Sequence, residues 1–260
     1  MDSSDIKDMV RARYGAIAVA SSGCCGPASE ERRTDADSRA RASGMGYTDA
    51  DLAAIPEGAN LGLGCGNPQV VASLKSGETV VDLGSGAGFD CFLAARAVGP
   101  QGHAIGVDMT HEMLAKAREN QKKLGITNAE FRLGELEHLP VADATADVVI
   151  SNCVVNLVPD KVQVFREAFR VLTPGGRVAI SDVVNIAPLP PELAADPRLL
   201  CGCVSGAAPV HQIEAFLVAA GFSQIRVAPR AESRELVASW VPGQGIEDFV
   251  CSATIEARKP

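Results

Sequence analysis

Short apolar runs alternate with amphipathic stretches through the middle of the chain. The apolar runs predict strands at residues 79–83, 104–108, 130–133, 146–151 and 177–183. The stretches between them predict three helices, one that includes Phe92, Leu93 and Ala97 and two at 110–124 and 160–172. Thr110 is a suitable N-cap, Gly125 ends the second helix, and Pro174-Gly175-Gly176 end the third. Buried strands that alternate with helices are typical of a parallel sheet covered on both faces.

The two ends of the chain add three elements and one irregular segment. Apolar residues recur at helical spacing from Asp5 to Ala20, which predicts a helix that packs on the body. The breakers and charges that follow predict a mobile surface arm over residues 21–44, carrying two thiols. Residues 222–227 and 249–255 predict two further strands. We therefore predict an α/β fold with a doubly wound, mostly parallel sheet and an N-terminal helical arm.

Composition and charge narrow the possible partners. With 47% hydrophobic and 22% charged residues among 260, the chain is typical of a soluble globular protein. A net charge of −8 argues against nucleic acid or an anionic membrane, because both require a basic surface. No apolar stretch reaches the length of a membrane span, and the acidic start lacks the basic region of a signal peptide. We expect a cytoplasmic protein that binds neither nucleic acid nor membranes.

A glycine loop joins the strand at 79–83 to the helix after it. Its sequence, Gly84-Ser85-Gly86-Ala87-Gly88, lets the backbone approach a ligand closely and turn into the helix. A dinucleotide fingerprint would place a glycine where the chain has Phe89, so NAD binding is disfavoured. Asp108 ends the second strand about twenty residues later, where a carboxylate can accept both ribose hydroxyls. The alternative is a set of turn glycines and an aspartate that caps the next helix.

The segments "VVDLGSGAGFD" and "GVDM" resemble the first two motifs of class I S-adenosylmethionine-dependent methyltransferases. The resemblance implies a seven-stranded sheet whose last strand runs antiparallel, with S-adenosylmethionine as the cofactor. It also implies that residues 84–88 hold the methionine moiety, that Asp108 holds the ribose and that Met109 packs on the adenine. The cofactor-binding residues that we predict are Asp82, Gly84, Ser85, Gly86, Gly88, Asp108, Met109, Gly134, Glu135 and Asn152.

Three residues in this set rest on separate arguments. The segment "LGELEHLP" follows the strand at 130–133, where the family contacts the adenine edge. Gly134 and Glu135 are therefore candidates there, with Glu135 as an acceptor for the adenine amino group, directly or through its backbone. Asn152 is equally compatible with holding the amino-acid end of the cofactor and with a turn at the end of a strand.

The chain has eight cysteines, which is unusual for a cytoplasmic protein and is not expected to be a disulfide framework. None forms a C-x-x-C pair, so the sequence disfavours a zinc site. Cys91 lies within an apolar helix and Cys251 alternates in phase with apolar strand residues, which predicts that both fill the core. Cys65 and Cys203 lie in glycine-flanked loops that no core requires, which favours a functional role.

The segments "NLGLGCGNP", "SNCVVNL", "RVLTPGGR" and "CVSGA" resemble the arsenite methyltransferases, and the likeness spans nearly the whole chain. The resemblance implies that Cys153 and Cys203 bind trivalent arsenic. It implies that Cys65 and one of Cys24 and Cys25 serve as a third ligand or a redox relay. The doubled Cys24-Cys25 and the additional Cys201 depart from the family pattern, so which thiol of each pair acts stays open.

The same resemblance implies the reaction, its partners and a division of the chain. The catalytic residues would be Cys153, Cys203, Cys65, Cys24 and Cys25, with arsenite or its thiol adducts as substrate and a small thiol or a thioredoxin-type protein as reductant. We assign residues 1–60 to the N-terminal helix and thiol-bearing arm. Residues 61–186 form the S-adenosylmethionine-binding core, and residues 187–260 form the arsenic-site cap with the last two strands.

Arsenic chemistry supports this interpretation independently. Trivalent arsenic is soft and thiophilic, so thiolates are the expected ligands. Three sulfurs leave an arsenic lone pair that can accept a methyl group, and a lone pair carries no proton for a base to remove. A quinone or small-molecule carbon methyltransferase is one alternative, which would not explain the cysteine positions. A non-catalytic thiol protein that sequesters arsenic or another soft metal is the other, against which the intact glycine loop argues.

Overall fold

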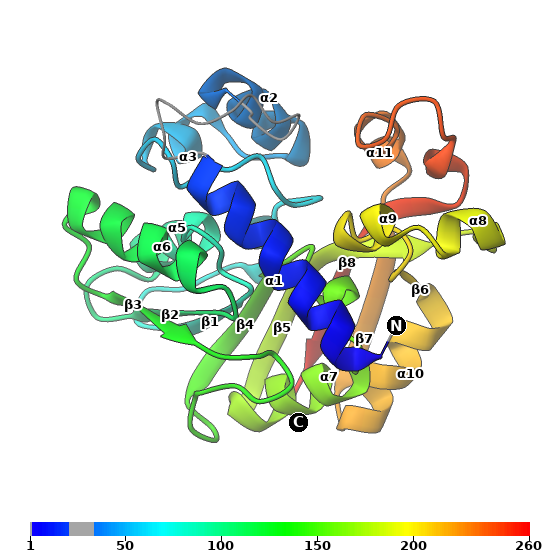
Figure 1. The fold of residues 1–260 in the computed structure, drawn as a ribbon. Coiled ribbons are helices and arrows are strands. Elements are labelled where there is room, and N and C mark those ends of the chain that lie inside the picture. The colour runs from blue at the N-terminus through cyan, green and yellow to red at the C-terminus, as the bar shows by residue number, and fades with distance from the viewer. Residues whose placement is uncertain (1, 21–33) are drawn as a thin grey trace.

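A computed structural model describes residues 2–20 and 34–260 of the chain (Figure 1). The predicted thiols Cys24 and Cys25 lie outside these residues. Seven strands form one continuous sheet in the order β3-β2-β1-β4-β5-β8-β7, and the two-residue strand β6 pairs with β5. The strands are β1 (Thr79–Leu83), β2 (His103–Asp108), β3 (Ala129–Leu133), β4 (Ala146–Asn152), β5 (Leu172–Asn185), β6 (Ala208–Pro209), β7 (Ser223–Pro229) and β8 (Val250–Arg258).

The sheet has the predicted doubly wound, mostly parallel form. Strands β1 to β5 pair in parallel, whereas β8 runs antiparallel to both β5 and β7. Continuously apolar strands alternate their side chains between two buried clusters, because successive residues of a strand face opposite sides. In β1, Val81 and Leu83 belong to one cluster and Val80 to the other. Helices therefore cover both faces of the sheet, as the sequence predicts.

One face packs against α7 and α10, and the other packs against α4, α5 and α6. The main helices are α1 (Ser3–Ala20), α2 (Asp35–Met45), α4 (Pro68–Ala72), α5 (Phe89–Val98), α6 (His111–Leu124), α7 (Lys161–Val171) and α10 (Val210–Ala220). Short helices complete the chain: α3 (Asp49–Ala53), α8 (Pro191–Ala194), α9 (Pro197–Cys201), α11 (Arg234–Ala238), and the 3-10 turns η1 (Val155–Leu157), η2 (Ala231–Ser233) and η3 (Ile246–Asp248). Thr110 and Gly125 flank α6 as predicted, although the Thr110 side chain makes no capping hydrogen bond.

Two local predictions are wrong. Residues 34–44, the described part of the predicted surface arm, contain most of helix α2, which Thr34 begins with a capping box and which buries Ala42. The capping side chains and the few buried residues stabilise a helix that is too polar to show a clear apolar period. The strand predicted at residues 177–183 begins earlier, at Leu172, so Pro174-Gly175-Gly176 lie within β5, while α7 ends at Val171, one residue before its predicted end.

Helix α1 crosses in front of the sheet, over the ends of the central strands (Figure 1). It contacts α6 on one side and η1 on the other. Within residues 2–20 and 34–260, no helix combines the length and apolar character that a membrane crossing requires. The position of α1 leaves a cavity between this helix and the carboxyl ends of the strands.

Candidate active site

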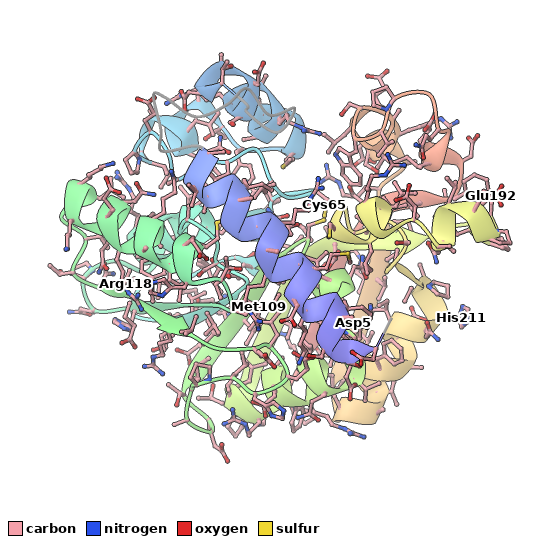
Figure 2. The ribbon with its side chains drawn as sticks, viewed as in Figure 1. Asp5, Cys65, Met109, Arg118, Glu192 and His211 are labelled. Atoms are coloured by element: carbon pink, nitrogen blue, oxygen red, sulfur yellow. The ribbon has the colours of Figure 1, made fainter. Side chains whose placement is uncertain are left out.

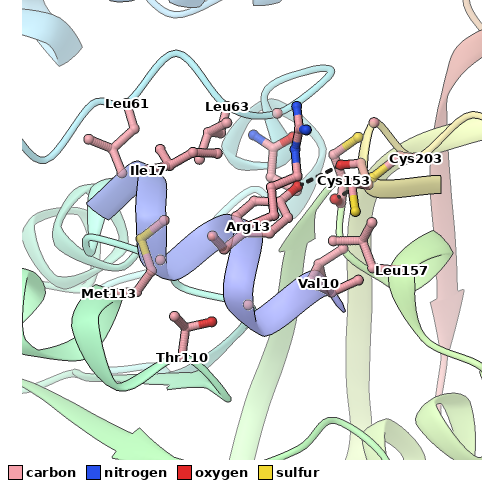
Figure 3. Close-up of a pocket in the computed structure, with 18 of the residues that line it drawn as sticks. Val10, Arg13, Ile17, Leu61, Leu63, Thr110, Met113, Cys153, Leu157 and Cys203 are labelled. Atoms are coloured by element: carbon pink, nitrogen blue, oxygen red, sulfur yellow. Dashed lines mark hydrogen bonds between the residues drawn. The ribbon is translucent and has the colours of Figure 1, made fainter. Parts of the chain in front are cut away.

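A cavity of about 530 Å³ lies between α1 and the carboxyl ends of the central strands. Parallel sheets place ligands at this edge, where the loops after neighbouring strands diverge. Figure 3 shows Val10, Arg13 and Ile17 of α1 on one side of the cavity and Cys153 and Cys203 on another. The glycine loop and the cysteine-bearing loops therefore face one shared cavity.

The glycine loop has the conformation that its sequence requires. Gly84, Gly86 and Gly88 all have positive φ angles, of 70°, 52° and 93°. A Cβ atom on Gly84 would lie 2.5 Å from the side chain of Val154, so the chain has no room for one. At Gly86 such an atom would meet only Met113 at 3.9 Å, which leaves the backbone open toward the cavity. The loop can therefore approach a ligand closely, as predicted.

An acidic cluster lies beside the loop. The Oδ2 atom of Asp82 and the hydroxyl of Ser85 are buried and have no hydrogen-bond partner within the described chain. Burial, followed by the nearby carboxylates of Asp90 and Asp108, raises the pKa of Asp82 well above its usual value. Unpaired buried oxygens are costly unless a ligand satisfies them. A cationic group with hydrogen-bond donors, such as the ammonium group of an amino acid, fits this cluster.

Asp108 lines the same cavity at the end of β2. Its carboxylate accepts hydrogen bonds from the backbone N–H of Gly86 at 2.9 Å and of Thr110 at 2.8 Å. These bonds fix the orientation of the carboxylate and leave acceptor capacity, because two carboxylate oxygens offer about four lone pairs. The Asp108 carboxylate therefore joins the glycine loop to the residue before α6 and still presents an acceptor for a ribose.

The structure places Gly134 and Glu135 away from this cavity. Both line a second depression, which shares Met109 with the main cavity. The Glu135 carboxylate accepts a hydrogen bond from Lys7 at 2.7 Å and lies 3.4 Å from Arg11, both on α1. Contact of Glu135 with an adenine stays a prediction, and its carboxylate is engaged by α1.

The side-chain amide of Asn152 forms hydrogen bonds with other residues of the chain. Its side-chain oxygen accepts a hydrogen bond from the Cys65 N–H at 3.0 Å, and its nitrogen donates to the Gly66 carbonyl at 2.8 Å. The same nitrogen reaches the hydroxyl of Tyr47 and the carboxylate of Asp90. Asn152 therefore ties the Cys65 loop to the first turn of α5, and its predicted contact with a cofactor stays untested.

Three cysteines line the same cavity: Cys153, Cys201 and Cys203. Cys203 donates a hydrogen bond from Sγ to the carbonyl oxygen of Cys153 at 2.9 Å. Cys65 is buried and does not line the cavity, although it hydrogen-bonds with the Cys153 side chain. Figure 2 shows Cys65 and Met109 on different sides of α1 in that view. The predicted cysteines 65, 153 and 203 are thus brought together.

Cys153 and Cys203 share an unusual backbone conformation. Their φ angles are +59° and +64°, in the left-handed region that residues with a side chain seldom adopt. Each such residue costs on the order of 1–2 kcal/mol, and residues of this kind cluster at functional sites. The Cys153 N–H donates to the carbonyl of Ser181 at 2.8 Å, which helps to hold the strained turn. The strain supports a functional role for both thiols.

The thiols are held in their protonated form. Burial raises the pKa of the Cys65 thiol. A hydrogen bond with Cys153, followed by burial, raises the pKa of Cys203 well above its usual value. For Cys153 the hydrogen bond from Cys203 lowers the pKa, but the bond with Cys65 and burial outweigh it, so the pKa is also well above normal. Each thiol therefore carries a proton at neutral pH until a ligand displaces it.

Asp182 is a buried carboxylate that the sequence analysis missed. It lies in β5, and one of its oxygens and the sulfurs of Cys65 and Cys153 all lie within 4.8 Å of one another. Burial raises the pKa of Asp182 to about 6. The N–H groups of Val183 and Val155 and the nearby ammonium of Lys161 lower this pKa, but burial outweighs them. In the sequence, Asp182 could have been recognised as a candidate site residue because it is a carboxylate inside an otherwise apolar strand.

The sequence predicts only that α1 packs on the body, yet Tyr14 of this helix reaches the cysteine loops. Its hydroxyl donates a hydrogen bond to the carbonyl of Cys201 at 3.2 Å. Burial, followed by the three cavity thiols, raises the pKa of Tyr14 well above its usual value, so the phenol stays neutral. Val10, one turn away on the same face, also lines the cavity. This side of α1 forms the wall that faces the thiols.

The structure also places two predicted core cysteines and two further residues, Trp240 and His211. Cys91 and Cys251 are buried in apolar clusters and do not line the cavity, which confirms that they fill the core. Trp240 packs near the thiols and lines the cavity, so it is part of the site's wall. His211 lies exposed in the first turn of α10.

Comparisons with known proteins find methyltransferases. A family model described as a methyltransferase domain matches residues 74–232. The chain is 53% identical over its full length to an arsenite methyltransferase of Halobacterium salinarum, and covers 68% of that protein. It is 42% identical over 63% of its length to an arsenite methyltransferase of Aquipseudomonas alcaligenes, of which it covers 49%.

A comparison with solved structures also finds an arsenic methyltransferase. The crystal structure of an arsenic(III) S-adenosylmethionine methyltransferase from Chlamydomonas reinhardtii matches 85% of this chain with a TM-score of 0.60 and 33% identity. The match covers 72% of that chain.

Helix α1 is tethered over the cavity by Lys7, which binds Glu135 at 2.7 Å and Glu137 at 2.9 Å. Lys7→Met should make local opening of α1 easier by about 1 kcal/mol, the upper range for partly exposed ion pairs. Amide hydrogen exchange in α1 should then become up to about fivefold faster. Lys123→Met removes an exposed pair with Glu119 on α6 and serves as the control. Equal exchange in α1 for both variants would contradict the tether.

Proposed function

The chain belongs to the arsenite methyltransferase family, and we propose that it transfers methyl groups from S-adenosylmethionine to trivalent arsenic bound by its cysteines. One observation carries the proposal: the same cavity is lined by the glycine loop with its unpaired acidic groups and by three thiols. A methyl transfer requires the donor and the acceptor to lie in contact with each other and away from water.

The acidic end of the cavity suits S-adenosylmethionine. Asp82 and Ser85 offer unpaired buried oxygens to the ammonium group of the methionine moiety, and the open backbone at Gly86 fits beside it. Asp108 presents a carboxylate to the ribose, and Met109 offers an apolar surface to the adenine. When bound, the cofactor supplies a methyl group on a sulfonium centre, which a soft lone pair can accept.

The protonated thiols that line the same cavity are suited to capture arsenite. Each thiol that binds replaces one arsenic hydroxide, and the thiol proton leaves with that hydroxide as water. The exchange of an As–O bond for an As–S bond is therefore balanced without a separate base. Cys153 and Cys203 are the ligands we assign, with Cys65 or Cys201 as the third, because both lie beside them. Cys24 and Cys25 remain candidates for delivering arsenic or for redox relay.

The walls around the thiols keep the bound arsenic in place. Val10 and Tyr14 of α1, with Leu157 and Trp240, enclose this end of the cavity. Tyr14 stays neutral, so it adds no charge beside a nucleophile that is a lone pair. The role of these residues is to position arsenic and exclude water, because a lone pair has no proton to lose.

The biological setting follows from the same chemistry. We place the reaction in the cytoplasm, where thiols stay reduced, and assign it to arsenic detoxification. A small thiol or a thioredoxin-type protein would deliver arsenite as a thiol adduct and keep the cysteines reduced. Methyl transfer to carbon, as in a quinone methyltransferase, would not use the clustered thiols. Simple sequestration of arsenic would not use the glycine loop.

Asp108→Ala should weaken S-adenosylmethionine binding while arsenite binding stays nearly unchanged. The ribose would lose a charge-assisted acceptor, worth about 1.5–3 kcal/mol. Calorimetric titration of the variant with each ligand measures both effects. Wild-type affinity for the cofactor would mean that Asp108 serves only to cap α6.

Cys153→Ser and Cys203→Ser should each abolish detectable methylation of arsenite. Serine oxygen is a hard donor, and water competes with it for arsenic, so arsenic loses its fixed position beside the methyl group. The assay incubates each variant with S-adenosylmethionine, a thiol and arsenite, and separates the arsenic products by chromatography. Cys251→Ser, in a buried strand outside the cavity, is the control and should retain activity. A Cys153→Ser variant with the wild-type rate would overturn the ligand assignment.

A further inference from the structure

Behind the cavity, two thiols and a carboxylate form a compact set. The Sγ atoms of Cys65 and Cys153 and an oxygen of Asp182 lie within 4.8 Å of one another. Cys65 and Asp182 are almost fully buried, with 1% of each residue exposed, whereas Cys153 reaches the cavity. Cys153 is thus shared between this inner set and the thiols that line the cavity. The sequence predicts Cys65 and Cys153 at one site but not Asp182, which lies far from both along the chain.

We propose that Cys65, Cys153 and Asp182 form a binding site for a divalent thiophilic cation of the Zn²⁺ class, which competes with arsenic for Cys153. Two sulfurs and one carboxylate oxygen are a ligand set that Zn²⁺ accepts in tetrahedral geometry. The fourth place is left to a water molecule, because the Cys203 thiol is hydrogen-bonded to the Cys153 carbonyl oxygen and lies outside this set. Both thiols release their protons to the solvent when the cation binds.

The surroundings hold the donors in place before any cation arrives. One oxygen of Asp182 accepts the Val155 N–H at 2.9 Å, and the other accepts the Asn156 side chain and the Val183 N–H, both at 2.8 Å. The Cys65 backbone is fixed by the Ser252 hydroxyl at 2.8 Å and by Asn152. Such outer contacts orient ligands and typically change metal affinity by about 10–100-fold.

Charge and softness distinguish the inner set from the arsenic ligands. Two thiolates and one carboxylate carry three negative charges, which suits a doubly charged cation with the Lys161 ammonium nearby. Trivalent arsenic gains nothing comparable from a carboxylate oxygen, because it prefers sulfur. The cation site therefore depends on Asp182, whereas arsenic binding does not. Competition between the two rests on the proposed function, but the cation site itself does not.

The test titrates Co²⁺, a spectroscopic substitute for Zn²⁺, into the reduced full-length chain carrying Cys24→Ser and Cys25→Ser. These substitutions remove the thiols outside the described residues. We expect one equivalent of Co²⁺ to produce the absorption of a tetrahedral cobalt–thiolate centre and Zn²⁺ to abolish it. Absence of that absorption at saturating Co²⁺ would overturn the proposal.

Variants on the same background locate the site. Cys65→Ser and Asp182→Asn should each weaken Co²⁺ binding by more than about 100-fold, beyond the usual effect of outer contacts. Cys251→Ser, whose thiol belongs to a separate cluster, should bind Co²⁺ like the parent. Thermal unfolding checks that Asp182→Asn still folds. Parental affinity in Cys65→Ser overturns the assignment, whatever the outcome for Asp182→Asn.

A methylation assay then tests the competition. Zn²⁺ should raise the arsenite concentration needed for half-maximal rate without changing the maximal rate, and Asp182→Asn should be less sensitive to Zn²⁺. Zn²⁺ inhibition that arsenite cannot relieve would overturn the competition. The cobalt spectrum requires neither arsenic nor S-adenosylmethionine, so failure of the proposed function and failure of the cation site give different results.

Discussion

The carboxyl ends of β1, β4 and β5 meet at one edge of the sheet, and each part of the candidate site depends on this meeting. β1 ends in the glycine loop, β4 ends at Asn152 beside Cys153, and β5 carries Ser181 and Asp182. The hydrogen bond from the Cys153 N–H to Ser181 joins two of these ends directly. Parallel pairing thus brings the cofactor loop and the first thiol together without any long connecting segment.

Helix α1 completes the site by covering one side of the cavity. Burial and neighbouring groups keep the pKa values of Asp82 and Cys203 above their ordinary ranges, and the thiols stay protonated until arsenic or a cation binds. Burial also strengthens the electrostatic interactions around these groups, since the local dielectric falls. The strained backbones of Cys153 and Cys203 are the cost of placing two thiols at one end of this space.

The sequence predicts the sheet well because its strands are continuously apolar and end at turn residues such as Gly84. It also identifies the cofactor loop and Asp108, because these lie in one local strand–loop–helix segment. Helix α2 is missed because its stability depends on capping and a few buried contacts. Tyr14 and Asp182 are missed because only the fold brings α1 and the end of β5 to the thiols.

X-ray absorption at the arsenic edge tests the central claim most directly, that the fold assembles thiols to hold trivalent arsenic beside the glycine loop. The full-length chain is loaded with one equivalent of arsenite, and the atoms around arsenic are identified. The account predicts a shell of sulfur alone, and a shell in which oxygen replaces a sulfur in Cys153→Ser. A shell of oxygen in the parent chain, or an unchanged sulfur shell in Cys153→Ser, would contradict it.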